Sequence, residues 1–543
     1  MKKILLLLIV LSSCCSFSQE EDAIVYFKNK PDAATFLANP LSMLSQRSLD
    51  RRIAQNIALD IKDVPVHQPY YDQIATASGL IVLAKSKWLN CVYVRGSIAS
   101  IQSLSNLSFV DNVKFFDNTL NFSNNLPNNN VSLKTKNIDK FAQINASYNY
   151  GNSLNQIQML NGQILHQQNF TGTGKIIAVL DSGFPGVDTA QPFQRIINNN
   201  QILGGYDYVN KNSDYFSGHF HGTWVLSCMG GYTDNQLVGT APDAKYYLYI
   251  TEDVATENPV EEANWVEAAE EADRVGADII TSSLGYFGYD NPAYSHDYSD
   301  MTGDKNFASK GANIAFSRGI IVVASAGNSG NDTNEPHVGV PAEATNVLAI
   351  GAVKSDRIRA SFSSIGPSFD NRIKPDIMAQ GQASIVSGVN GNIQTANGTS
   401  FSGPIMAGMI ASFWQAVPTL SNQQVVNLVK QSADNFATPN EFYGYGIPNF
   451  QTALSLSNPN FVINNRKSFS IYPNPILNQA ELLFPNGFEN ATLSFFNLIG
   501  QNISNYEVSV KNNTINTSNL SSGVYMYKIE SNNMVQTGKI IKN

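Results

Sequence analysis

The stretch KIIAVLDSG, residues 175–183, sets the fold class of the longest part of this chain. It is a short apolar run that ends in a carboxylate and a glycine. Continuous Ile/Val/Leu runs of this kind are typical of strands buried on both faces of a parallel sheet. Four more runs of similar texture predict further strands of that sheet: KYYLYI (245–250), DIITSSLG (278–285), GIIVVASAGN (319–328) and NVLAIGAV (346–353).

An amphipathic helix is predicted between two of these strands, over PVEEANWVEAAEEADRVG (259–276). Trp265, Ala268, Ala269 and Ala272 share one face of it, and the glutamates take the other face. Strands that alternate with helices in this way indicate an α/β domain with a mainly parallel sheet. We expect this domain to occupy residues 148–456.

Regions of different texture flank the α/β domain. Residues 20–118 mix alternating apolar runs with a charged helical stretch, which predicts a small α+β unit. Residues 119–147 include the Asn-rich stretch NFSNNLPNNN (121–130) and are expected to form a solvated linker. Residues 467–543 contain short apolar runs separated by Asn, Gly and Pro turns, which is typical of an antiparallel β-sandwich.

The first 19 residues have the layout of a secretory signal peptide. Lys2 and Lys3 precede an apolar run, residues 4–11, and small residues follow. This run is much shorter than the ~20 residues that a membrane-spanning helix needs. The stretch LSSC (11–14) also resembles a lipoprotein cleavage box, which leaves a lipidated protein as the alternative.

The composition is that of a globular protein that does not bind nucleic acid. Of the 543 residues, 43% are hydrophobic and 14% are charged, which excludes a largely disordered chain. The formal net charge is −8, whereas phosphate binding calls for basic patches. We therefore expect no nucleic-acid partner.

Three motifs place a carboxylate, an imidazole and a hydroxyl at the ends of predicted elements. Asp181 closes the strand in AVLDSG, His221 begins the helix in HGTWVLSCMGG, and Ser400 opens the helix in NGTSFSGPIMAG. Such ends meet at one edge of an open α/β sheet. A serine nucleophile needs a base, histidine serves near neutral pH, and a carboxylate orients the imidazole. The Ser400 N–H and the Asn328 amide are the expected donors to the oxyanion.

Together these motifs resemble the signature blocks of the subtilisin-like serine proteases. The blocks DSG, HGT and GTS occur in that family's order, and SSLG, GTAPDA, ASAGN and GYGIPN also resemble family segments. The resemblance implies a three-layer subtilisin-like domain and a serine endopeptidase that works through an acyl-enzyme. It assigns Asp181 as orienting residue, His221 as base, Ser400 as nucleophile and Asn328 as oxyanion donor. The residues it implies for substrate binding are Ser283, Leu284, Gly285, Ala326 and Gly327.

The flanking regions resemble known companions of such proteases. Residues 20–118 resemble inhibitory propeptides, with an independent accessory domain as the alternative. SIYPNP (470–475), FNLIGQ (496–501), LSSGVYMYKIE (520–530) and TGKIIK (537–542) resemble the sorting domain of the type IX secretion system, with a carbohydrate- or protein-binding sandwich as the alternative. The resemblance implies a zymogen that is secreted or held at the cell surface. Its partners would be peptide or protein substrates, the outer-membrane secretion machinery, and its own propeptide as inhibitor.

No cofactor is expected for the chemistry, and no metal site is assigned. DYSDMTGDK (297–305) could hold a structural calcium ion, but the ligand pattern of a calcium loop is incomplete and a solvated loop is preferred. His219 lacks a metal-ligating partner motif and is interpreted as a loop residue. Cys228 is interpreted as a small buried hydrophobe.

The competing function is a surface adhesion or binding protein built on an inactive protease fold. Such a protein would lack a triad or oxyanion residue, and none is missing. The segments 283–285 and 324–327, expected to wall the primary pocket, carry no acidic residue. They predict a preference for apolar or aromatic side chains before the scissile bond.

Overall fold

The structure is a computed structural model that divides into two compact units, Met1–Ala453 and Leu454–Asn543. It describes residues 20–121, 148–457, 469–472, 476, 478–485, 488–510, 512–532 and 534–542. The expected signal peptide and lipoprotein box lie outside the described residues. So do residues 122–147 of the expected linker and 473–475 of the SIYPNP motif.

A seven-stranded sheet forms the centre of the first unit, in the order β13-β12-β11-β10-β5-β9-β6. All neighbouring strands are parallel, as predicted for the α/β domain. The five predicted strands are confirmed. The strands are β5 (Ile176–Asp181), β6 (Ile202–Asp207), β9 (Lys245–Ile250), β10 (Ile279–Ser282), β11 (Ile321–Ser325), β12 (Leu348–Val353) and β13 (Ile377–Gln380).

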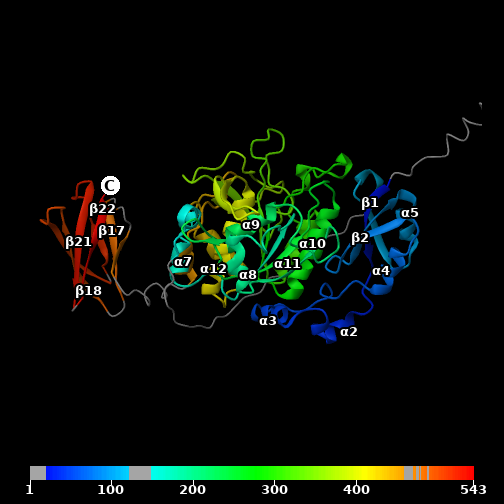
Figure 1. Ribbon diagram of the computed structural model, residues 1–543, viewed down its shortest axis with the longest axis horizontal. Coiled ribbons are helices and arrows are strands. Elements are labelled where there is room, and N and C mark those ends of the chain that lie inside the picture. The colour runs from blue at the N-terminus through cyan, green and yellow to red at the C-terminus, as the bar shows by residue number, and fades with distance from the viewer. Residues whose placement is uncertain are drawn as a thin grey trace, which may run out of the picture. The chain divides into compact units, whose positions relative to one another are not determined.

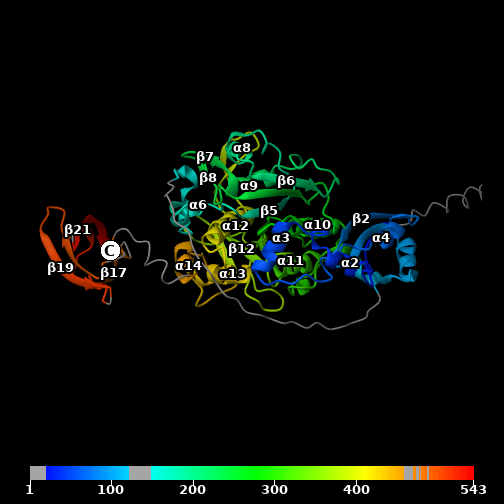
Figure 2. The same ribbon diagram turned by 90° about the horizontal axis from the view of Figure 1, so that it is seen from below.

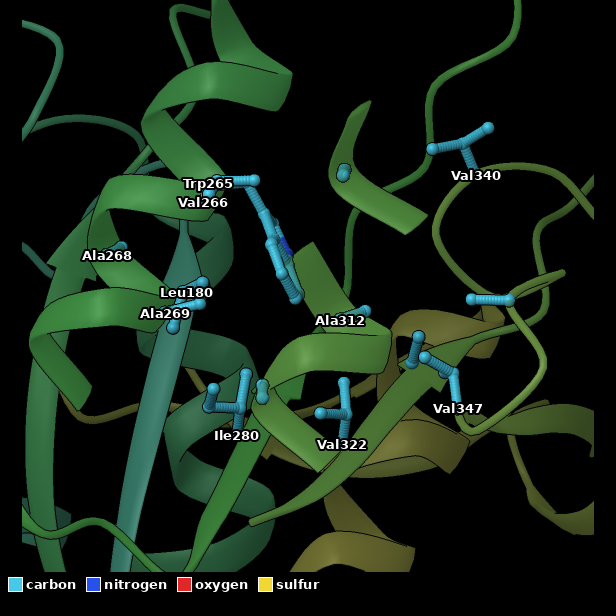
Figure 3. Packing of buried hydrophobic residues seen from close by; sticks show 14 of the residues in the cluster. Leu180, Trp265, Val266, Ala268, Ala269, Ile280, Ala312, Val322, Val340 and Val347 are labelled. Carbon is cyan, nitrogen blue, oxygen red and sulfur yellow. The ribbon is translucent and has the colours of Figure 1, made fainter. Parts of the chain in front are cut away.

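Helices cover both faces of this sheet and complete the three-layer fold. On one face, α10 (Val260–Val275) and α11 (Phe307–Ser317) bury Trp265 near Ile280 and Val322 of the strands (Figure 3). On the other face, α12 (Thr399–Ala416) packs across several strands beside α9 (His221–Gly230). Gly403 permits this close approach, because a Cβ there would lie 2.7 Å from Ser325 Oγ.

Shorter elements surround the three layers. The small antiparallel pairs are β7 (Tyr232–Thr233) with β8 (Leu237–Val238), and β14 (Ser384–Ser387) with β15 (Ile393–Ala396). The remaining α-helices of residues 148–457 are α6 (Leu154–Gln158), α7 (Gln163–Gln167), α8 (Gln194–Asn198), α13 (Asn422–Gln431) and α14 (Phe450–Ser457).

Residues 20–121 form an α+β region around a four-stranded antiparallel sheet, β2-β3-β1-β4. This agrees with the expected α+β unit, and the region packs against α10 (Figure 1) and against Phe307 at the start of α11. Its strands are β1 (Glu20–Phe27), β2 (Leu80–Ser86), β3 (Cys91–Ser97) and β4 (Val110–Phe115). Its α-helices are α2 (Ala33–Ala38), α3 (Gln46–Ala54), α4 (Gln68–Ala75) and α5 (Ile98–Ser103).

The polar face of α10 differs from a solvated helix face. Glu261, Glu262 and Glu270 are buried. Glu261 and Glu262 accept hydrogen bonds from other residues of the α/β domain, whereas Glu270 is covered by the N-terminal region. Glu270 accepts hydrogen bonds from Ser86 Oγ at 2.6 Å and from the backbone N–H of Trp88 at 2.9 Å. Glu270 on this face therefore binds another part of the chain instead of facing solvent.

The second unit is a sandwich of two antiparallel sheets, as expected. One has the order β16-β17-β20 and the other β19-β18-β21-β22. Leu482 of the first and Leu493 and Phe495 of the second share one buried core. The strands are β16 (Ser470–Tyr472), β17 (Gln479–Leu483), β18 (Asn490–Phe496), β19 (Asn502–Ser509), β20 (Thr514–Asn516), β21 (Gly523–Ser531) and β22 (Met534–Lys542).

None of the helices in the described ranges is both long and apolar enough to cross a membrane.

Candidate active site

Asp181 and His221 meet at the carboxyl edge of the central sheet. Asp181 is the last residue of β5, and His221 is the first residue of α9. His221 Nδ1 lies 2.8 Å from Asp181 Oδ1, which also accepts the backbone N–H of Ser182 at 2.8 Å. The Asp181 side chain is fully buried, whereas 24% of the His221 side chain is exposed. One imidazole nitrogen is thus held by a buried carboxylate, and the ring remains accessible from solvent.

The electrostatic surroundings of His221 favour its protonated form. Burial by itself lowers the pKa of the imidazole, but the negative charge of Asp181 and the hydrogen bond to it raise the pKa above its ordinary value, with a smaller contribution from Glu252. A base whose protonated form is stabilised accepts a proton from a hydroxyl more readily. The pair therefore has the electrostatics of a general base with its orienting carboxylate.

Ser400 is the second residue of α12 and lies beside this pair. The ring of Phe401, the next residue, is 6.1 Å from the His221 ring, centre to centre. Ser400 Oγ donates a long hydrogen bond of 3.5 Å to the carbonyl oxygen of Ser283, and Ser283 Oγ donates to the carbonyl oxygen of Ser400 at 3.0 Å. Residues of β5, α9 and α12, together with Ser283 directly after β10, thereby converge on one edge of the sheet.

The Asn328 amide is oriented by Thr399, the first residue of α12. Asn328 Oδ1 accepts the backbone N–H of Thr399 at 2.9 Å and the Thr399 hydroxyl at 3.1 Å. Since a backbone N–H can only donate, these bonds identify the oxygen of the amide. The Nδ2 donor lies near Gly398, where an added Cβ would be 3.7 Å away. Asn328 therefore presents an N–H donor close to Ser400.

A cavity of about 480 Å³ opens beside the nucleophile candidate. Its wall includes Ser400, Asn328 and all five residues expected to bind substrate: Ser283, Leu284, Gly285, Ala326 and Gly327. The first three follow β10 and the other two follow β11, so parallel strands bring both segments to the same edge. The cavity can hold an extended chain next to the Ser400 hydroxyl and the Asn328 amide, and His221 is not among the residues that line it.

Comparison with known proteins gives the family. The profile of the Subtilase family matches residues 172–446, just over half of the chain. The chain belongs to the subtilase family. Subtilisin DY of Bacillus licheniformis is 30% identical over 55% of this subtilase and 97% of its own length. Subtilisin NAT of Bacillus subtilis subsp. natto is 32% identical over 55% of this subtilase and 70% of its own length. The crystal structure of MycP1 from Mycobacterium smegmatis matches with a TM-score of 0.45 and 21% identity, over 58% and 89% of the two chains.

Two further profiles match the regions that flank the catalytic domain. The Peptidase S8 propeptide domain of Bacteroidota matches residues 22–135, and the secretion system C-terminal sorting domain matches residues 470–543. The subtilase is therefore a serine endopeptidase made as a zymogen, and its sorting domain marks it as a secreted or cell-surface protein of the type IX secretion system.

Sequence reasoning missed three residues with carboxylate or imidazole side chains that line the cavity of this subtilase. They are Asp332, Glu335 and His337, which belong to the loop between β11 and β12. Burial lowers the pKa of His337, so its imidazole is neutral near pH 7 and does not cancel the carboxylates. The acidic stretch NDTNEPH (331–337) was the available signal, but the linear sequence does not show that the loop folds back onto the pocket.

The other candidates of the sequence lie outside this constellation. Cys228 is fully buried on α9, and burial raises the pKa of its thiol. Asp300 of the DYSDMTGDK stretch forms an ion pair with Lys305. His219 Nδ1 is buried and has no hydrogen-bond partner. Across the described parts of the chain, no group of three or more His, Cys, Asp or Glu side chains is placed to hold a metal ion.

Proposed function

We propose that this subtilase hydrolyses peptide bonds through a triad of Asp181, His221 and Ser400. Ser400 Oγ attacks the scissile carbonyl carbon while His221 Nε2 takes its proton. The carbonyl oxygen becomes an oxyanion, to which Asn328 Nδ2 and the backbone N–H of Ser400 donate. His221 then gives the proton to the leaving amine, and the acyl group stays on Ser400. Water hydrolyses this ester by the same steps, and Asp181 stabilises the imidazolium each time.

The 2.8 Å contact between His221 Nδ1 and Asp181 Oδ1 carries this proposal. A hydrogen bond at Nδ1 leaves Nε2 as the nitrogen that accepts the proton of the nucleophile. Ser400 and Asn328 support the proposal because they line the same cavity. Ser283, Leu284 and Gly285 would then pair with the substrate backbone as an added strand.

The remaining parts of the proposal concern maturation. Residues 20–118 would act as an inhibitor of the folded enzyme, and residues 1–19 would direct export. Cutting within 119–147 would separate the propeptide, because the Asn-rich composition of this segment is typical of a linker. The outer-membrane secretion machinery would recognise residues 467–543. No cofactor takes part in the proposed chemistry.

Fluorophosphonate labelling tests the nucleophile. We expect the purified protein, with residues 20–121 removed, to be labelled at Ser400 and the Ser400→Ala variant to stay unlabelled. Ser329→Ala is the matched control, because Ser329 lines the same cavity, and it should be labelled as the parent is. Absence of labelling in the folded parent would contradict the triad and favour a binding protein on an inactive protease fold.

We also expect the pocket to accept Lys or Arg before the scissile bond, in addition to the apolar side chains that its neutral walls favour. Asp332 and Glu335 add two carboxylates to its lining, and partly exposed charges attract a cation modestly. Glu335→Gln should lower kcat/KM for a peptide with Lys at that position several-fold, and leave a Leu peptide unchanged. The difference should shrink at high salt.

A matched pair of peptide substrates measures this preference. Glu441→Gln, which removes an exposed carboxylate outside the cavity lining, should change neither rate. If Glu335→Gln lowers kcat/KM equally for the Lys and Leu peptides, Glu335 supports the loop and does not select the side chain.

A further inference from the structure

A segment of the propeptide domain extends away from its sheet to a second place on the catalytic domain. We call residues 33–66, between β1 and α4, the basal arm. It contains α2 and α3, and both views place α3 beside α10 and α11 (Figures 1 and 2). The backbone N–H of Ser45 donates to the carbonyl oxygen of Arg274 at 2.9 Å, so α3 starts on the last turn of α10.

Buried charges join the basal arm to the catalytic domain. Arg52 Nη2 donates to Asp273 Oδ2 at 2.7 Å and to Asp63 Oδ1 at 2.9 Å. Arg51 pairs with the other oxygen of Asp273 and donates to the carbonyl oxygen of Ala277. The side chains of Arg51, Arg52, Asp63 and Asp273 are at most 5% exposed. Asp273 thus receives two guanidinium groups from the arm in a site closed to water.

The contact continues along the arm on both sides of these arginines. Arg47 Nη2 lies 2.5 Å from Asp278 Oδ2. Gln55 Nε2 donates to the carbonyl oxygen of Gly319 at 2.9 Å, and Gln55 Oε1 accepts the N–H of Asn422 at 2.9 Å. One ion pair has its cation on the catalytic domain: Arg318 Nη2 donates to both carboxylate oxygens of Asp60 of the arm, at 2.8 and 3.0 Å.

The arm binds the edge of the sheet opposite to the active site. Asp273–Asp278 precede β10, and Arg318 and Gly319 precede β11, whereas Ser283 and Ala326 follow these strands. Asp278 also accepts the N–H of Ile176, the first residue of β5, whose last residue is Asp181. At ~3.3 Å per residue, the two ends of β5 are about 17 Å apart. The contacts of the arm with the catalytic domain therefore lie far from the triad.

We propose that the basal arm is a second docking site of the propeptide, which keeps the propeptide on the enzyme after the linker has been cut. This rests on the proposed role of residues 20–118 as an inhibitor. The partner that the catalytic domain accepts here is a helix carrying paired arginines, supplied by its own N-terminal region. Cutting the linker leaves these contacts intact, and the arm can leave only if the Asp273 carboxylate loses both guanidinium partners.

The test follows the N-terminal fragment after the linker is cut. The full chain carries Ser400→Ala, so that it does not process itself, and a recognition sequence for a site-specific protease within residues 122–147. After cutting, size-exclusion chromatography and mass spectrometry measure how fast the fragment dissociates. We expect the parent complex to survive chromatography. Arg52→Met should dissociate about 100-fold faster or more, the scale for breaking a buried pair by removing one partner. Lys62→Ala, an exposed lysine of the same arm, should dissociate as the parent does.

Two further variants keep the test decisive. Arg47→Ala removes a side chain that is 41% exposed and should fold even if Arg52→Met does not; we expect it to dissociate several-fold faster. The double variant Asp273→Asn, Arg52→Met should speed dissociation by less than the product of the two single fold-changes, because both substitutions remove the same ion pair. Immediate loss of the parent fragment, or unchanged dissociation in Arg47→Ala and Arg52→Met, would overturn the proposal. The readout is mass, so it is independent of whether Ser400 proves to be the nucleophile.

Discussion

Asp181→Asn is expected to lower kcat by about 10⁴-fold, the scale known for the orienting carboxylate of serine protease triads. The substitution keeps the size of the side chain but removes the charge next to His221 Nδ1. Because that charge raises the pKa of His221 against the effect of burial, its loss should lower the pKa. The imidazolium that forms during the reaction then loses its buried counter-charge.

The pH profile separates this cause from damage to the fold. The base is active when neutral, so a lower His221 pKa moves the acid limb of kcat/KM to lower pH in Asp181→Asn. Asp188→Asn removes an exposed carboxylate seven residues further along the chain and should leave both the rate and the profile unchanged. A large fall in rate with an unmoved acid limb would argue that Asp181 only supports the structure.

Asn328→Ala is expected to lower kcat by about 10²–10³-fold with little change in KM. The scale is that known for one oxyanion donor in subtilisin, a relative of this chain. Asn328 Oδ1 is occupied by Thr399, so the donor that remains for the reacting oxygen is Nδ2. This donor acts mainly when negative charge develops on the substrate oxygen, so the effect falls on turnover more than on binding.

Asn328→Asp distinguishes the donor from the support that Asn328 gives to α12. Aspartate keeps an acceptor for the Thr399 N–H but replaces the donor by a negative charge. Its kcat should be no higher than that of Asn328→Ala. Asn331→Ala, in the same exposed loop, should behave as the parent does. Recovery of activity in Asn328→Asp would assign Asn328 a structural role in place of the proposed one.

The central strands were predictable because burial on both faces demands continuous apolar runs, as in residues 176–181 and 348–353. The two edge strands were not. β6 contains Gly204 and Gly205 and its residues up to Tyr206 are only half-buried, while β13 has four residues and follows Pro375. The apolar signal of β6 is weak because this edge strand is only half-buried, whereas β13 is fully buried but too short to give a distinct apolar run.

The site shows the same division between local and tertiary signals. The motifs around Asp181, His221 and Ser400 are local, and the parallel sheet brings their ends to one edge. The contributions of Asp332 and Glu335 to the pocket depend on how a loop folds back. The burial of Glu270 and Asp273 depends on residues 182 to 225 positions away in the chain. A carboxylate on a helix gives no sequence signal that tells a solvated face from a docking face.

The burial of Cys228 on α9 makes this cysteine a built-in reporter of local opening. Its thiol is fully buried, and burial raises its pKa, so a thiol reagent reacts only when the surroundings of the helix open. Among the described residues, the other cysteine is Cys91, which would leave with the propeptide domain in the proposed maturation. In the matured enzyme, the rate at which Cys228 is modified therefore measures how often the helix that begins at His221 opens locally. Native-state thiol exchange, with and without a bound inhibitor, measures how rigidly the enzyme holds its base.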